Sequence, residues 1–226
     1  RYAFALGESA SLVVTNGAHF TVRYLKAYED GSRIVICDGS SVGVQDFSLG
    51  NGELVLDDSF AACQALFVNN EINRHDDARL LIRGRNPQLR WRLYDPRTLA
   101  LVAANASVCR MGQIDFEIPS GGYAATPVDC SASYEKYPFG DCDKLFTSGR
   151  TTNLTVRVVN AKADYASIPK RQELIRWSPS GIMKSRLDLV EPAQKRAHFA
   201  YSDETDFPLA LELVNDRTIG TMIIVQ

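Results

Sequence analysis

Arginine residues gather in one short stretch and form the most distinctive group of chemically capable side chains in the sequence. Between Arg79 and Arg97 there are six arginines, no lysine and a single acid, Asp95. Guanidinium groups bind carboxylate, sulfate and phosphate in a planar, bidentate way that lysine cannot copy. The stretch therefore indicates a site for an anionic ligand.

Side-chain alternation along extended chain predicts how this arginine stretch is displayed. We expect Leu80 and Ile82 to face the core, and Asn86-Pro87 to form a hairpin turn between two strands. The outer face of that hairpin would then offer its cationic side chains to a polyanion, an acidic glycan or an acidic protein. The alternative is that acids just upstream, Glu71, Asp76 and Asp77, cover it. The predicted binding residues on this face are Arg79, Arg83, Arg85, Arg90, Arg92 and Tyr94.

A second candidate for recognition is the segment between Cys130 and Cys142, which contains three aromatic residues, Tyr134, Tyr137 and Phe139. Tyrosine supplies contact area at a low entropic cost. Binding residues also concentrate on loops that a rigid scaffold positions. The alternative is that these rings pack over the edge of the core.

Signals for catalysis are weaker. Gly39-Ser40-Ser41-Val42-Gly43 matches the G-x-S-x-G nucleophile pattern, but no helix pattern follows it, so we expect a turn rather than a catalytic Ser41. In His75-Asp76-Asp77, neighbouring residues of a strand would point to opposite faces and chelate a metal poorly. We predict no catalytic residue, no metal ligand and no cofactor.

Acidic pairs keep an enzymatic alternative open. Glycoside cleavage uses two carboxyl groups roughly 5 to 10 Å apart. The sequence cannot show which acids meet across a groove, so a carbohydrate-active hydrolase or lyase stays an alternative. The candidate acids are Asp57 with Asp58, Asp141 with Asp143, and Asp203 and Glu204 with Asp206.

The cysteine spacing bears on the cellular compartment. There is no Cys-x-x-Cys, which disfavours a structural zinc site or a thioredoxin-like redox pair. We expect two disulfides, Cys37 with Cys63 and Cys130 with Cys142, and one cysteine left over, Cys109. This interpretation indicates a secreted protein in an extracellular, periplasmic or cell-surface location. The alternative is five reduced thiols.

Composition excludes several classes of protein. Twenty-five basic and 27 acidic residues leave a net charge of −2, so the chain has no overall field for binding nucleic acid. No run of about 18 apolar residues occurs, and we therefore expect no membrane span. The opening Arg1-Tyr2-Ala3-Phe4 lacks the pattern of a signal peptide and suggests a mature form or an excised ectodomain.

Short runs of alternating or β-branched residues, separated by Gly, Asn, Asp and Pro turns, predict an all-β fold. We expect two β-sandwich-like domains, 1–119 and 151–226, joined by a linker or long disulfide-closed loop at 120–150. One large sandwich or jelly roll is the alternative. A helix is predicted at 58–72 and a short helix or turn at 170–177, and we detect no internal repeat. The clearest predicted strands are 11–15, 20–25, 33–37, 53–56, 79–82, 113–118, 153–159, 196–201 and 209–214.

These observations favour an extracytoplasmic, non-catalytic binding or adhesion module that recognises an acidic glycan or an acidic protein partner. A carbohydrate-active enzyme is one alternative. The other is an assembly subunit of a surface or viral structure, in which exposed strand edges join copies into a homo-oligomer.

Overall fold

A computed structural model gives the fold of the chain, and the description below covers the ranges in which residues are placed. These ranges are 3–27, 29–49, 52–67, 78–91, 111–129, 154–159, 167–177, 187–192, 197–202 and 209–216.

The described residues form strands arranged in two sheets. Sheet A consists, in spatial order, of β1 (Ala3–Leu6), β3 (His19–Ala27), β5 (Ser41–Leu49), β7 (Phe60–Phe67), β9 (Gln88–Trp91), β11 (Val128–Asp129), β13 (Arg171–Trp177), β16 (Leu209–Asn215) and β15 (Ala197–Tyr201). Sheet B consists of β14 (Leu187–Val190), β12 (Leu154–Val158), β10 (Met111–Phe116), β8 (Ala78–Arg83), β6 (Glu53–Asp57), β4 (Arg33–Ile36) and β2 (Ser11–Val14).

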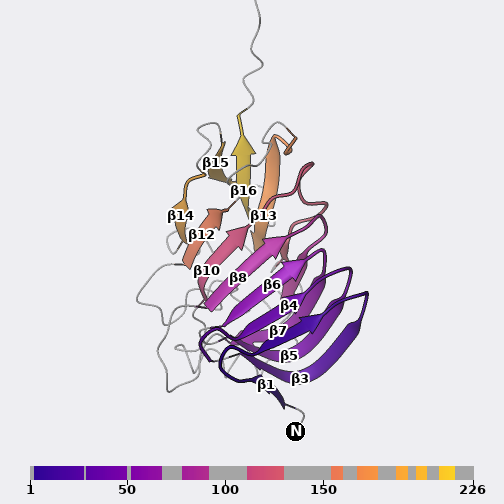
Figure 1. Cartoon of the computed structure of the whole chain (residues 1–226). Helices are drawn as coiled ribbons and strands as arrows, with labels where there is room; N and C mark the ends of the chain where they lie inside the picture. Colours follow the sequence, from indigo (N-terminus) through magenta and orange to yellow (C-terminus); the bar gives the residue numbers. More distant parts are fainter. Residues whose placement is uncertain are drawn as a thin grey trace, which may run out of the picture.

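Successive strands alternate between the two sheets, so that the chain winds as a solenoid. Each coil supplies one strand to sheet A and one to sheet B, and neighbouring coils pair in parallel from β1 to β13 (Figure 1). The last two strands of the described part depart from this rule, because β15 and β16 both belong to sheet A and β16 runs antiparallel to both β13 and β15. Repetition of one supersecondary unit, with each unit contacting its neighbours, is typical of solenoid proteins.

The expected fold class is therefore wrong: the strands form neither two sandwich-like domains nor a jelly roll, both of which are built from antiparallel strands. The sequence marks turns between the expected strands but does not show which sheet each strand joins. In the structure these turns carry the chain from one sheet to the other. For example, Asn16-Gly17 joins β2 of sheet B to β3 of sheet A, and Asp38-Gly39 joins β4 to β5.

The first two coils show an internal repeat that the sequence analysis missed. Ser11 pairs with Arg33 and His19 pairs with Ser41, in each case 22 positions further along the chain. The corner turns stack in the same way, because the Gly17 amide donates to the Asp38 carbonyl at 3.0 Å. Asn16 and Asp38 both have positive φ, 60° and 53°, which Asn and Asp tolerate better than most residues.

Alternating side chains of both sheets fill the space between them and make one core. On sheet B the inward residues form rows across successive coils, and their central members are completely buried. Such a row consists of Ile34, Leu54, Leu80, Ile114 and Val156. Phe116, also completely buried, contacts the ring of Tyr123 with centroids 6.4 Å apart. Burial and the nearby charge of Glu117 raise the pKa of Tyr123 well above its ordinary value.

Both predicted helices fall on strands in the described part. Residues 60–67 of the first form β7, which pairs in parallel with β5 and β9, and residues 171–177 of the second form β13. Pairing with neighbouring coils outweighs the helix-like spacing of Phe60, Gln64 and Phe67. Within the described ranges no helix has the length and apolar character needed to cross a lipid bilayer.

The predicted domain boundary at 120–150 coincides with continuous sheets in the described residues. β10 pairs with β12 across this segment, and β11, which lies inside it, pairs with β13. One core cluster includes residues from both sides, such as Leu25 and Leu213. The division of the chain into domains 1–119 and 151–226 stays a prediction. A boundary at this place would cut through the pairing of β10 with β12.

Candidate anion-binding site

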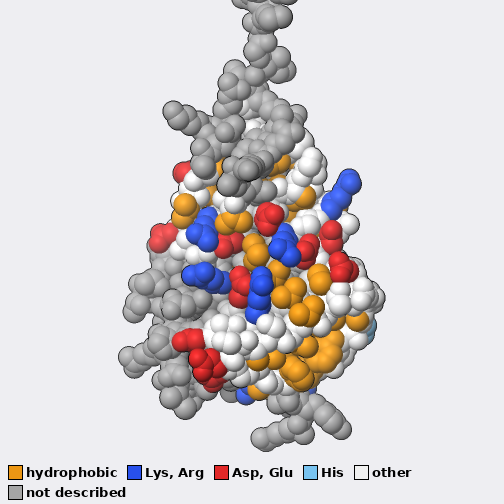
Figure 2. Space-filling view, in the orientation of Figure 1, with side chains coloured by type: hydrophobic (Ala, Val, Ile, Leu, Met, Phe, Trp, Pro, Cys, Tyr) orange, Lys and Arg blue, Asp and Glu red, His pale blue; other side chains and the backbone are white. Residues whose placement is uncertain are grey.

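The outer surface of sheet B carries charged residues whose ion pairs join neighbouring coils. Figure 2 shows basic and acidic side chains intermingled across the middle of this surface. Among the described residues of this surface, three ion pairs link adjacent strands, at N···O distances of 2.5 to 2.7 Å. We call this surface the charged face; it consists of Arg33, Glu53, Asp57, Arg79, Arg83, Asp115 and Arg157.

Parallel register is what brings these residues together. Arg33 lies beside Glu53, and Glu53 lies beside Arg79, at the first outward position of β4, β6 and β8. Neighbouring strands are about 4.8 Å apart, so the three side chains form one row of alternating charge. Residues that are far apart in the sequence thus become direct neighbours.

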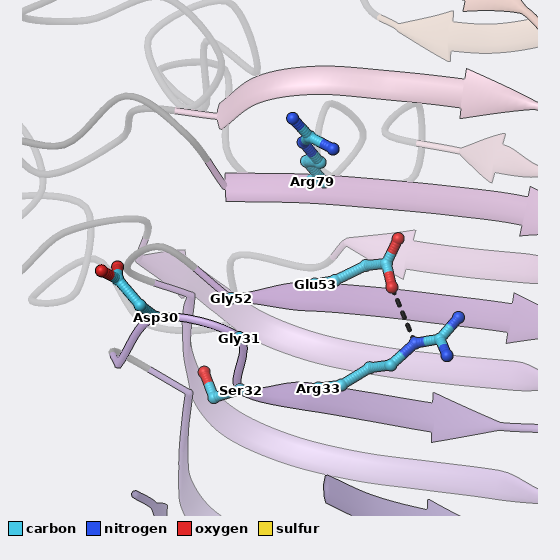
Figure 3. A pocket seen from close by; sticks show the side chains of 7 residues that line it. All are labelled: Asp30, Gly31, Ser32, Arg33, Gly52, Glu53 and Arg79. Carbon is cyan, nitrogen blue, oxygen red and sulfur yellow. Dashed lines mark ion pairs between the residues drawn. The ribbon is translucent and has the colours of Figure 1, made fainter. Parts of the chain in front are cut away.

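Arg79 is the unsatisfied member of this row. The Nε atom of Arg33 lies 2.7 Å from a carboxylate oxygen of Glu53, and Figure 3 marks this ion pair with a dashed line. Arg79 is exposed and, among the described residues, its guanidinium has no ion pair or hydrogen bond. The row therefore holds two guanidinium groups against one carboxylate, with the surplus positive charge at Arg79.

A pocket of about 480 Å³ opens beside this row, where β4, β6 and β8 begin. Its volume falls within the range typical of small-molecule sites. Figure 3 shows that the Asp30 carboxylate and the Arg79 guanidinium lie on different sides of it. The pocket is lined by Asp30, Gly31, Ser32, Arg33, Gly52, Glu53 and Arg79.

Two glycines shape the backbone around this pocket. Gly31 has a φ of +69°, which glycine adopts at little cost. At Gly52 a Cβ atom would lie 2.6 Å from the carbonyl oxygen of Ala27, so the strand can approach this closely only without a side chain. The buried Ser32 hydroxyl donates to the Glu29 carbonyl at 2.7 Å and fixes the turn between them.

The remaining arginines of β8 and of the turn after it have different roles. Arg83 is bound by Asp57 at 2.7 Å and is therefore less available to a ligand. The neighbouring Asp58 accepts hydrogen bonds from the backbone N–H groups of Arg85 and Asn86. Both acids of the candidate pair Asp57 and Asp58 thus bind other groups of the protein. The Arg85 side chain is exposed.

The predicted arginine hairpin is not formed. β8 pairs with β6 and β10 in sheet B, whereas β9, which contains Arg90, pairs with β7 and β11 in sheet A. Arg79 and Arg90 therefore lie in different sheets, and the predicted face of five arginines does not assemble. The Arg90 side chain lies outside the described part of the chain, as do Arg92, Tyr94, Tyr134, Tyr137 and Phe139.

Asp115 and Arg157 form a closed pair that the sequence analysis missed. The Arg157 Nε atom donates to Asp115 at 2.5 Å, and Gln113 Nε2 donates to both carboxylate oxygens of Asp115, at 2.8 and 2.7 Å. The hydrogen bond from Arg157 to Asp115 raises the pKa of the Arg157 guanidinium. Because the Arg157 guanidinium is already bound to a carboxylate, this pair offers less to a ligand than Arg79.

Ser41 and His19 meet on the outer surface of sheet A. The Oγ atom of Ser41 lies 2.7 Å from His19 Nδ1, and His19 Nε2 lies 3.0 Å from the hydroxyl of Thr21. A hydrolytic triad needs an acid to orient the histidine and donors for an oxyanion. Here Thr21 occupies the acid's position, and the Ser41 backbone N–H is bonded to the Ala18 carbonyl. A strand follows Ser41, as β5, instead of a helix.

The described residues give no support to the predicted disulfides. Cys37 is a free thiol in the structure, so its bridge to Cys63 is not formed. The side chain of Cys63 lies outside the described part, as do Cys109, Cys130 and Cys142. The acid groups Asp141 with Asp143 and Asp203 with Glu204 and Asp206 also fall there, together with His75. Among the described side chains no cluster of His, Cys, Asp or Glu is arranged to hold a metal ion.

Comparison of the chain with protein-family models, with curated proteins and with solved structures finds no match.

Proposed function

We propose that this protein is a non-catalytic binding module that recognises an acidic glycan through Arg79 and the pocket beside it. The observation that carries the proposal is the row Arg33–Glu53–Arg79, in which one guanidinium is left with no partner among the described residues. A guanidinium presents a fork of N–H donors that fits a carboxylate or sulfate. Such a group on a sugar would bind Arg79.

The chemistry of the pocket favours a sugar over an acidic peptide. Acidic side chains at Asp30 and Glu53 lie in the same pocket as Arg79. A carboxylate accepts hydrogen bonds from sugar hydroxyls but repels the repeated charges of an acidic peptide. A sugar that carries one anionic group and several hydroxyls satisfies both kinds of lining residue. An extracellular, periplasmic or cell-surface location is part of this proposal.

One observation supports the enzymatic alternative, and another argues against it. Asp30 and Glu53 line a common pocket, and glycoside hydrolases use a pair of carboxyl groups. However, Glu53 is bound to Arg33, and Figure 3 shows the two carboxylates pointing in different directions. A binding role fits this geometry better.

Replacing Arg79 with glutamine should weaken binding to acidic polysaccharides about tenfold, because one charge-assisted hydrogen-bonding group is worth about 1.5 kcal/mol or more. Isothermal titration with alginate, polygalacturonate, hyaluronan and heparin fragments measures this. The Glu53→Gln variant should change affinity in the opposite direction, since it removes the carboxylate between two guanidiniums. Binding of the unaltered protein should also weaken as salt is added.

The matched control is Arg23→Gln. Arg23 is an exposed arginine on the other sheet, with its guanidinium 5.1 Å from the ring centroid of Tyr24. If Arg79→Gln and Arg23→Gln lose the same amount of affinity, the effect comes from the overall charge of the protein and not from a site at Arg79. This result would contradict the proposal. So would tighter binding to polyglutamate than to every glycan. Release of cleaved sugar products from any of these polymers would favour the enzymatic alternative.

A further inference from the structure

The row Arg33–Glu53–Arg79 continues beyond the pocket across sheet B. Its next members in the register are Gln113 of β10 and Thr155 of β12, neither of which carries a charge. In the described part of the chain the whole row consists of Ser11, Arg33, Glu53, Arg79, Gln113, Thr155 and Asp188. Two cations therefore stand on either side of one acid, and an uncharged stretch follows them.

The sheet sets the spacing of the two cations. Neighbouring strands are about 4.8 Å apart, so the backbone positions of Arg33 and Arg79, two strands apart, are separated by about 9.6 Å. Each sugar lengthens an extended glycan by roughly one such strand spacing. A glycan that lies along the row thus places one sugar on each strand, and every second sugar lies over a guanidinium.

Arg33 keeps hydrogen-bonding capacity for a second anionic group. A guanidinium has five N–H donors, and the bond from Arg33 Nε to Glu53 uses one of them. The Arg33 side chain is 44% exposed and lines the same pocket as Arg79. Figure 3 shows the guanidinium groups of Arg33 and Arg79 on opposite sides of the Glu53 carboxylate. Both cations can therefore contact one ligand.

Glu53 determines what can lie between two anionic groups. Its side chain is 32% exposed, so a sugar placed on β6 contacts its carboxylate. A carboxylate accepts hydrogen bonds from hydroxyl groups and repels another carboxylate or a sulfate. The sugar that fits this position is therefore an uncharged one.

Building on the proposed binding of an acidic glycan at Arg79, we propose that the ligand is a glycan in which acidic and neutral sugars alternate. Two acidic sugars bind Arg33 and Arg79, and the neutral sugar between them donates hydroxyl groups to Glu53. A polymer with an acid on every sugar brings one acid against Glu53, and this repulsion selects against it. In its described part the row offers no cation to a third acidic sugar, because Gln113 and Thr155 are uncharged.

Short oligosaccharides test the alternation directly, by titration of the unaltered protein followed by nuclear magnetic resonance. A hyaluronan trisaccharide with acidic sugars at both ends should bind about fivefold more tightly than the disaccharide that has one acidic sugar, because it adds a charge-assisted contact with Arg33. Trigalacturonate, in which every sugar is acidic, should bind more weakly than this trisaccharide although it carries more charge.

Arg33→Gln should remove the gain from the second acidic sugar, so that the trisaccharide and the disaccharide bind equally. The matched control is Arg83→Gln. Arg83 also binds a carboxylate on the neighbouring strand through its Nε atom at 2.7 Å and is similarly exposed, but it does not line the pocket. This variant loses the same charge and should keep the gain. Comparing the two ligands within each variant cancels any general change in affinity.

Glu53→Gln should raise the affinity for trigalacturonate more than for the hyaluronan trisaccharide, because it removes a repulsion that only trigalacturonate experiences. Three results would overturn the alternation: trigalacturonate binding as tightly as the trisaccharide to the unaltered protein, an undiminished gain in Arg33→Gln, or loss of the gain in Arg83→Gln. If Arg79→Gln still weakens the binding of hyaluronan, these results leave the proposed function standing. Unchanged binding in Arg79→Gln would contradict the proposed function itself, and the alternation with it.

Discussion

Replacing Phe116 with alanine should lower the free energy of unfolding by about 3 to 5 kcal/mol. Phe116 is completely buried in the middle of sheet B and contacts the ring of Tyr123. Removing its ring leaves a cavity lined by residues from both sheets, which the parallel ladders hold in place. Urea denaturation followed by circular dichroism measures the change.

Val13→Ala is the control for this prediction. Val13 also belongs to sheet B but is 56% exposed, so its truncation should change stability by no more than about 0.5 kcal/mol. A loss below about 1 kcal/mol in Phe116→Ala would mean that the two sheets do not enclose this ring.

Replacing Gly122 with alanine should destabilise the protein by about 2 to 4 kcal/mol. Its φ of +78° is unfavourable for a residue with a Cβ atom, and this contributes about 1 to 2 kcal/mol. The new Cβ atom would also lie 2.4 Å from Gln172 Oε1 and 2.5 Å from Pro169 Cδ, which adds about 1 to 3 kcal/mol of overpacking. The same buried Gln172 oxygen accepts the Tyr123 backbone N–H at 2.8 Å, so the substitution disturbs a hydrogen bond between the loop and β13.

Gly121→Ala separates these two contributions. Gly121 has nearly the same φ, +82°, but a Cβ atom there would have nothing within 4 Å. Only the backbone cost of about 1 to 2 kcal/mol should remain. Thermal or urea unfolding of both variants gives the difference, and equal losses would show that the loop does not pack against β13 as described.

Side-chain alternation predicted which residues of β8 face the core but not which strands β8 pairs with. Leu80 and Ile82 are fully buried and Arg79 is exposed, as the period of two requires. The same alternation is compatible with a hairpin and with a solenoid. Asn-Gly and Asp-Gly turns favour hairpins in general, and here they turn the chain between sheets. The fold class was wrong for this reason.

A repeat was present in the sequence and would have indicated the solenoid. Asn16-Gly17 and Asp38-Gly39 are 22 residues apart, and each follows a four-residue strand that ends in an aliphatic residue, Val14 or Ile36. A fixed period of about 20 residues is the signature of stacked coils. The repeat fades further along, because the next coils are interrupted by segments of unequal length.

The candidate site was only partly readable from the sequence. The high density of arginine residues in the sequence led to Arg79, which lines the pocket. The same density wrongly grouped Arg79 with Arg90, which belongs to the other sheet. Arg33 and Glu53 were missed because their proximity to Arg79 depends on the register between coils. No local pattern in the sequence predicts that register.

The most direct test of the account is the backbone neighbourhood of Leu80, measured by nuclear Overhauser effects in isotope-labelled protein. The site depends on parallel pairing of β8 with β6 and β10, which places Leu80 beside Leu54 and Ile114. We expect cross-peaks from the Leu80 backbone to both of these strands. Cross-peaks to residues 88–91 would instead show the antiparallel hairpin, separate Arg79 from Glu53, and contradict the solenoid together with the anion-binding row.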